Sequence, residues 1–120
     1  NVPEKAIEYI KIIISTYGSL SDTISELKKQ EFYDLIKDEI DLLDKITKSL
    51  TENNLSDNVR LDFSVINNMN YYNGIAFKGF IKGVPGGVLS GGQYDKLMNK
   101  MGKKSGAIGF AVYLDMLDRI

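Results

Sequence analysis

Glycine is confined almost entirely to one half of this 120-residue chain. Ten of its eleven glycines lie at or beyond Gly74. Charge divides in a similar way: residues 1–60 carry twelve acidic and eight basic side chains, whereas residues 61–120 carry four and seven. Because glycine weakens helices and suits turns and close backbone approaches, the two halves are expected to fold differently.

Residues 1–58 are predicted to form a helical segment, because apolar residues recur there every three or four positions. One set is Ala6, Ile7, Ile10, Ile13, Ile14 and Tyr17, and a later one is Phe32, Leu35, Ile36, Ile40, Leu43, Ile46 and Leu50. Pro3 suits the first turn of the first helix and Gly18 a left-handed C-cap. Thr23 and Glu26 fit a capping box for a short helix in between.

Four carboxylates share the third helix at helical spacing: Asp34, Asp38, Asp41 and Asp44. Lysines are interleaved with them. This pattern is more typical of a solvated helix face than of a metal site.

Residues 59–120 are predicted to form an antiparallel sheet with short helices. Residues 59–65 alternate apolar and polar side chains, as a half-buried strand does. Further strands are expected near residues 74–82, 87–90 and 107–111, with helices near Tyr94 and the C-terminus. Helices followed by strands indicate an α+β fold. We expect both segments to form one compact unit of a longer protein.

Composition excludes several classes of function. The chain has no cysteine and no histidine, so disulfides, thiolate metal sites and histidine-based triads are impossible. We expect no metal and no cofactor. A net charge of −1 gives no basic footprint, so nucleic acid is not an expected partner. The apolar runs, such as residues 12–14, are only a few residues long, and the first residues lack a signal-peptide pattern, which predicts a cytoplasmic protein without a membrane partner.

Two segments hold candidate binding residues, and a third position has a structural role. The glycine-rich stretch 83–92 either lets the backbone approach a ligand or forms a hairpin loop. Tyr71 and Tyr72 follow an asparagine-rich turn; either one packs and the other presents its hydroxyl to a pocket, or both are sheet aromatics. Asp95 is suited to N-cap the helix that begins there.

Three motifs, taken in order, resemble those of histidyl-tRNA synthetases and their paralogues. Residues 70–77, Asn-Tyr-Tyr-Asn-Gly-Ile-Ala-Phe, resemble Leu-Asp-Tyr-Tyr-Thr-Gly-x-x-Phe-Glu. Residues 91–97, Gly-Gly-Gln-Tyr-Asp-Lys-Leu, resemble Gly-Gly-Arg-Tyr-Asp-x-Leu. Residues 107–117 resemble the class II motif 3, Ala-x-Gly-Phe-Ala-x-Gly-Leu-Glu-Arg-Leu. The resemblance implies the antiparallel sheet of the class II aminoacyl-tRNA synthetase core over residues 59–117, preceded by a variable helical region.

The chain departs from these motifs where the family carries arginine. Asn67, Gln93 and Met116 occupy the three arginine positions, which the resemblance assigns to carboxylate and phosphate chemistry. A guanidinium holds phosphate charge with a bidentate, permanently charged fork, which amides and thioethers lack. Two acidic positions also change, to Lys78 and Asp115. These departures argue against adenylate synthesis, and we expect no catalytic residue.

The tyrosines and glycines of the motifs are retained. By resemblance, histidine binding is assigned to Tyr71, Tyr72, Gly91, Gly92 and Tyr94. This combination resembles the histidyl-tRNA-synthetase-like regulatory subunits of ATP phosphoribosyltransferase in histidine biosynthesis. The expected partners are then the catalytic subunit and L-histidine, within a homodimer or larger hetero-oligomer, with allosteric coupling between the ligand and the subunit interface. The alternative is a divergent histidyl-tRNA synthetase, a histidine–tRNA ligase.

Overall fold

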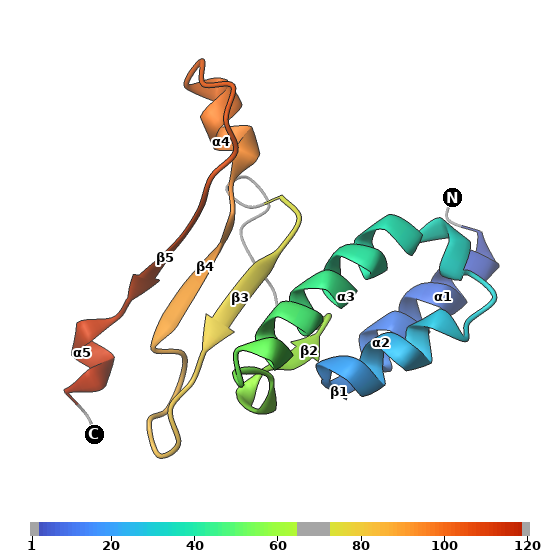
Figure 1. Ribbon diagram of the computed structural model, residues 1–120, viewed down its shortest axis with the longest axis horizontal. Helices are drawn as coiled ribbons and strands as arrows, with labels where there is room; N and C mark the ends of the chain where they lie inside the picture. The colour runs from blue at the N-terminus through green and yellow to red at the C-terminus, as the bar shows by residue number, and fades with distance from the viewer. Residues whose placement is uncertain (1–2, 65–72, 119–120) are drawn as a thin grey trace. The chain divides into compact units, whose positions relative to one another are not determined.

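The computed structural model describes residues 3–64 and 73–118 (Figure 1). The chain separates into two compact units, residues 1–65 and 66–120, where the sequence suggested one. Strand β2 (Arg60–Asp62) belongs to the first unit, because it pairs antiparallel with β1 (Tyr17–Ser19). The sequence grouped this strand with the second segment, since its alternating pattern shows one buried face but not which partner covers it.

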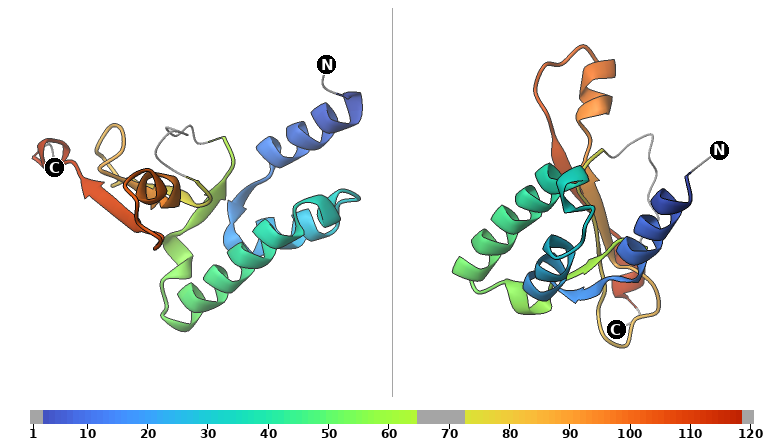
Figure 2. Two further views of the ribbon diagram at one scale, coloured as in Figure 1. Left: turned by 90° about the horizontal axis from the view of Figure 1, so that it is seen from above. Right: turned by 90° about the vertical axis from the view of Figure 1, so that its right-hand side faces the viewer.

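The first unit is built around α1 (Glu4–Ser15), α2 (Leu20–Lys28) and α3 (Lys37–Glu52), with α2 and α3 lying side by side (Figure 2). Its core consists of Ile24, Leu27 and Ile40, each at most 3% exposed. The predicted third helix begins later than expected, because the buried Phe32 lies in a turn, with its ring 4.6 Å from that of Tyr9.

Two predicted helix caps are wrong. Helix α1 ends at Ser15, and Gly18 lies within β1 at φ 138° rather than capping the helix. Helix α2 begins at Leu20, and the hydroxyl of Ser19 accepts the Asp22 backbone N–H at 3.4 Å. Thr23, predicted to cap this helix, is instead buried inside it. Several residues near residue 20 have side chains that could cap a helix, so the sequence alone does not fix where α2 begins. In the structure β1 ends at Ser19, and that residue caps α2.

Two acidic residues of α3, Asp41 and Asp44, pair with neighbouring side chains. Lys28 donates to Asp44 at 3.0 Å, and this hydrogen bond holds the pKa of Asp44 below its usual value. The hydroxyl of Tyr33 donates to Asp41 at 3.0 Å and raises the pKa of the tyrosine. Within residues 3–64 and 73–118, no three carboxylates gather in the way a metal ion requires.

The second unit is a three-stranded antiparallel sheet in the order β3-β4-β5. The strands are β3 (Ala76–Gly79), β4 (Leu89–Gln93) and β5 (Ile108–Val112), with α4 (Asp95–Lys100) at one end of the sheet and α5 (Leu114–Leu117) at the other (Figure 1). Residues 80–88 connect β3 to β4, as a hairpin loop does. The predicted α+β class is confirmed. Among the described residues, no helix has the length and apolar character needed to cross a membrane.

Candidate functional site

The two faces of the β3-β4-β5 sheet have different side chains. Cross-strand pairing places Ala76, Gly92 and Gly109 in one row and Lys78, Ser90 and Ala111 in the next. Side chains alternate across a sheet, so these two rows share one face, here named the small-residue face. The opposite, apolar face carries Phe77, Leu89, Phe110 and Val112. The small-residue face therefore leaves room for a ligand beside the backbone.

Tyr94 stands over the first row of the small-residue face. A Cβ atom added to Gly109 would lie 2.8 Å from the Tyr94 hydroxyl oxygen, so only glycine permits this approach. The backbone N–H of Tyr94 donates to the Ala107 carbonyl at 2.9 Å and fixes the residue where β4 ends. A half-buried aromatic ring with its hydroxyl at a glycine floor provides an apolar wall and a polar contact in one side chain.

Gln93 points to the apolar face and away from Tyr94. Its side-chain amide donates to Asp95 at 2.7 Å, and the other carboxylate oxygen of Asp95 accepts the Ala107 backbone N–H at 2.9 Å. Asp95 is the first residue of α4, with Tyr94 in the N-cap position, so the prediction that Asp95 caps the helix is wrong. Its carboxylate instead joins the end of β4 to the start of β5.

Removal of the Asp95 carboxylate should destabilise the second unit. In Asp95→Ala, the Ala107 N–H and the Gln93 amide lose their acceptor, which is expected to cost about 1–3 kcal/mol. Urea unfolding checks this value. The matched control is Asp118→Ala, at an exposed aspartate, where a change below about 0.5 kcal/mol is expected. Equal effects of the two substitutions would contradict a structural role for Asp95.

A shallow pocket of about 370 Å³ opens beside this carboxylate. It is lined by Gln93, Asp95, Gly106, Ala107 and Ile108. Gln93 and Ile108 are paired on the apolar face. Tyr94 is not among the residues that line this pocket.

Met116 lies at the other end of the sheet from Gln93. It is half-buried in α5, and its terminal methyl would be 3.6 Å from a Cβ atom on Gly86, in the loop between β3 and β4. The structure therefore does not bring these two arginine positions of the family together. Asn67, the third position, lies outside the described residues.

The residues predicted to bind histidine are divided between the two faces. Gly92 and Tyr94 share the small-residue face. Gly91 lies on the apolar face, where an added Cβ would be 2.7 Å from both Phe77 Cε2 and Phe110 Cβ. Tyr71 and Tyr72 lie outside the described residues.

Two residues of the small-residue face were missed in the sequence. Ser90 and Tyr113 bring their hydroxyl oxygens within 2.5 Å of each other. The signal was present, because Tyr113 stands where the quoted motif 3 has its second glycine. Only the pairing of β4 with β5 places it beside Ser90.

The fold and the motif-bearing sheet define a protein of the histidyl-tRNA synthetase type. The family model for histidyl-tRNA synthetase matches residues 1–117, so the chain belongs to this family and the predicted resemblance is confirmed. The class II synthetase-like fold is confirmed with it.

Relatives at the level of individual proteins carry a more particular name. An "ATP phosphoribosyltransferase regulatory subunit" of Acetivibrio thermocellus is 33% identical over 117 residues, covering 98% of this chain and 28% of that protein. One of Caldanaerobacter subterraneus subsp. tengcongensis is 34% identical over 94 residues, covering 78% and 24%.

A solved structure points the same way. The crystal structure of an "ATP phosphoribosyltransferase regulatory subunit/histidyl-tRNA synthetase" from Bacillus halodurans C superposes with a TM-score of 0.75 and 28% identity. The superposed region covers 88% of this chain and 27% of the Bacillus halodurans chain. The chain thus spans about a quarter of the length of these relatives.

Proposed function

We propose that this chain contributes to a non-catalytic, histidyl-tRNA-synthetase-like regulatory subunit of ATP phosphoribosyltransferase. Two kinds of support converge on this function. The relatives that match most of the chain bear that name. In addition, Gln93 and Met116 stand where the family motifs have arginine, and neither side chain can hold phosphate charge.

The observation that carries the proposal is the approach of the Tyr94 hydroxyl to Gly109 on the small-residue face. An imidazole needs a flat apolar wall and a hydrogen-bonding partner, and Tyr94 supplies both. We expect Tyr71 and Tyr72 to complete the wall, with Gly92 as part of the floor. The ligand of this site is then L-histidine.

Regulation follows if histidine binds two states of the assembly with different affinity. A ligand shifts a conformational equilibrium only by its differential affinity for the two states. The coupling is reciprocal, so the catalytic subunit would in turn alter histidine affinity. We propose that the subunit acts in the cytoplasm, as a homodimer or larger hetero-oligomer, with the catalytic subunit as its partner. In this assembly it senses histidine, and it also activates the catalytic subunit.

Histidine binding by the full-length protein tests this function. Calorimetry should detect binding to the wild type, and Tyr94→Ala should weaken it about tenfold or more, because both wall and hydroxyl are lost. Tyr94→Phe should lose less, since it keeps the ring. The matched control is Tyr17→Ala, at a 66% exposed tyrosine of the first unit, which should leave the affinity unchanged.

The absence of any histidine binding to the folded wild type would contradict the proposal. An equal loss of histidine affinity in Tyr94→Ala and Tyr17→Ala would show that Tyr94 is not part of the binding site. Melting curves of all variants show whether each one is folded.

The second candidate is a divergent histidyl-tRNA synthetase. The family model and the double name of the Bacillus halodurans structure favour it. A synthetase forms an adenylate, so the full-length protein would exchange pyrophosphate into ATP in the presence of histidine. We expect no such exchange, and its detection would replace the regulatory function with the catalytic one.

A further inference from the structure

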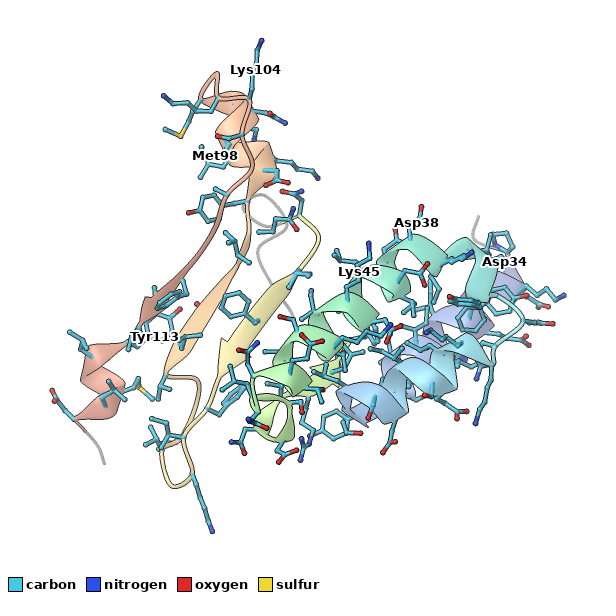
Figure 3. The ribbon with its side chains drawn as sticks, viewed as in Figure 1. Asp34, Asp38, Lys45, Met98, Lys104 and Tyr113 are labelled. Carbon is cyan, nitrogen blue, oxygen red and sulfur yellow. The ribbon has the colours of Figure 1, made fainter. Side chains whose placement is uncertain are left out.

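Tyr113 lies on the small-residue face, at the junction of β5 and α5 (Figure 3). Its backbone is extended, at φ −91° and ψ 94°, so it continues the alternation of β5 and its side chain follows those of Gly109 and Ala111. Its N–H donates to the Val88 carbonyl at 2.8 Å, which places Tyr113 level with Val88, the residue just before β4. The Tyr113 side chain therefore begins at the end of the sheet opposite to Tyr94.

The phenol of Tyr113 reaches back toward the second row of the small-residue face. Its hydroxyl oxygen lies 2.5 Å from that of Ser90, the middle member of the Lys78, Ser90 and Ala111 row. Ser90 comes two residues after Val88 in the chain. The side chain thus runs along the sheet between β4 and β5. It is 41% exposed, in agreement with a ring that has one side against the sheet.

A smaller residue at position 113 would leave this face open. Apart from Lys78 at one edge, the two rows contain only alanine, glycine and serine. The quoted motif 3 has glycine at position 113, so a family member with that glycine presents no ring there. A synthetase has to hold an amino acid and a nucleotide together in order to join them. Here the Tyr113 side chain occupies the surface beside the first row.

We propose that Tyr113 is a specificity-determining residue, which limits the small-residue face to a ligand the size of one amino acid and excludes a nucleoside beside it. The proposal rests on the function proposed above. It adds that nucleotide exclusion is steric, and is not only a consequence of the missing arginines.

The test is adenosine binding by the full-length protein and its Tyr113→Gly and Tyr113→Phe variants, measured by calorimetry. Adenosine is the appropriate probe because it has no phosphate, so the missing arginines cannot mask a gain. Tyr113→Gly should bind adenosine at least about tenfold more tightly than wild type, the scale on which pockets respond to a change in steric fit. Tyr113→Phe keeps the ring and should behave as the wild type does. Tyr113→Ala replaces the glycine variant if that variant does not fold.

Two results would overturn the proposal: adenosine binding to wild type as tight as to Tyr113→Gly, or no gain in a small-residue variant that melts as the wild type does. Histidine titrations of the same samples separate the two proposals. Failure of histidine to bind wild type contradicts the proposed function, whereas a gain of adenosine binding in Tyr113→Gly would still support the steric role of Tyr113.

Discussion

Gly91→Ala is expected to destabilise the second unit by about 3 kcal/mol, the upper part of the range for overpacked sites. Gly91 lies in the middle strand and is buried. An added Cβ would collide with the Gly109 carbonyl of β5 and would lie 2.7 Å from the Phe77 ring of β3. The carbonyl is backbone of the paired strand, so it cannot withdraw without disturbing the β4–β5 pairing. The added methyl group therefore cannot be accommodated on either side without displacing backbone or the Phe77 ring.

Hydrogen exchange resolved by peptide is the appropriate measurement. Gly91→Ala should lose protection most strongly in peptides from β3, β4 and β5. The matched control is Gly87→Ala, where the nearest contact of an added Cβ is the Gly79 carbonyl at 3.6 Å, an ordinary van der Waals distance. Its stability should stay within about 1 kcal/mol of wild type. Similar loss of protection in both variants would show that close approach across the sheet is not what requires glycine at position 91.

The positions of the strands were well predicted from sequence, because alternation and glycine punctuation are local signals. The structure confirms strands close to the expected segments 74–82, 87–90 and 107–111. The identity of strand partners is not a local property. Residues 60–62 alternate as expected, yet they pair with residues 17–19, some forty positions earlier in the chain.

The chemistry of individual site residues was harder to predict, since it depends on which face of the sheet each side chain takes. Gln93 and Tyr94 are adjacent in one motif, the first predicted to stand at a lost arginine position and the second to bind histidine. Their side chains point to opposite faces, and Gln93 is hydrogen-bonded to Asp95. The role of Asp95 could not be predicted either. Its carboxylate accepts a hydrogen bond from the backbone N–H of Ala107, which lies twelve positions away in the chain.

The same limit applies to Tyr113. Its departure from the family motif is visible in the sequence. Its hydrogen-bonding partner, Ser90, lies 23 positions away and could not be predicted from the motif. Sequence comparison thus shows where the chain differs from its family. The register of the sheet shows that this difference falls on the face that also carries Tyr94.

Leu27→Ala is expected to destabilise the first unit by about 2–5 kcal/mol, the range for truncation of a buried leucine to alanine. Leu27 is the one described side chain with no exposure at all, and it packs with Ile24 and Ile40 where α2 meets α3. Truncation removes apolar contacts and leaves a cavity between the two helices, which their hydrogen-bonded backbones cannot easily close. Urea unfolding gives the loss in free energy, and hydrogen exchange should place it in peptides from α2 and α3.

The matched control for this substitution is Leu35→Ala, which removes the same atoms from a side chain that is 76% exposed. Its effect should be below about 0.5 kcal/mol, because little apolar surface returns to water. Both residues belong to apolar patterns in the sequence, so the comparison separates periodicity from burial. If the two variants unfold at the same urea concentration, the core of the first unit does not lie between α2 and α3. A large loss for Leu27 alone would establish that core by measurement.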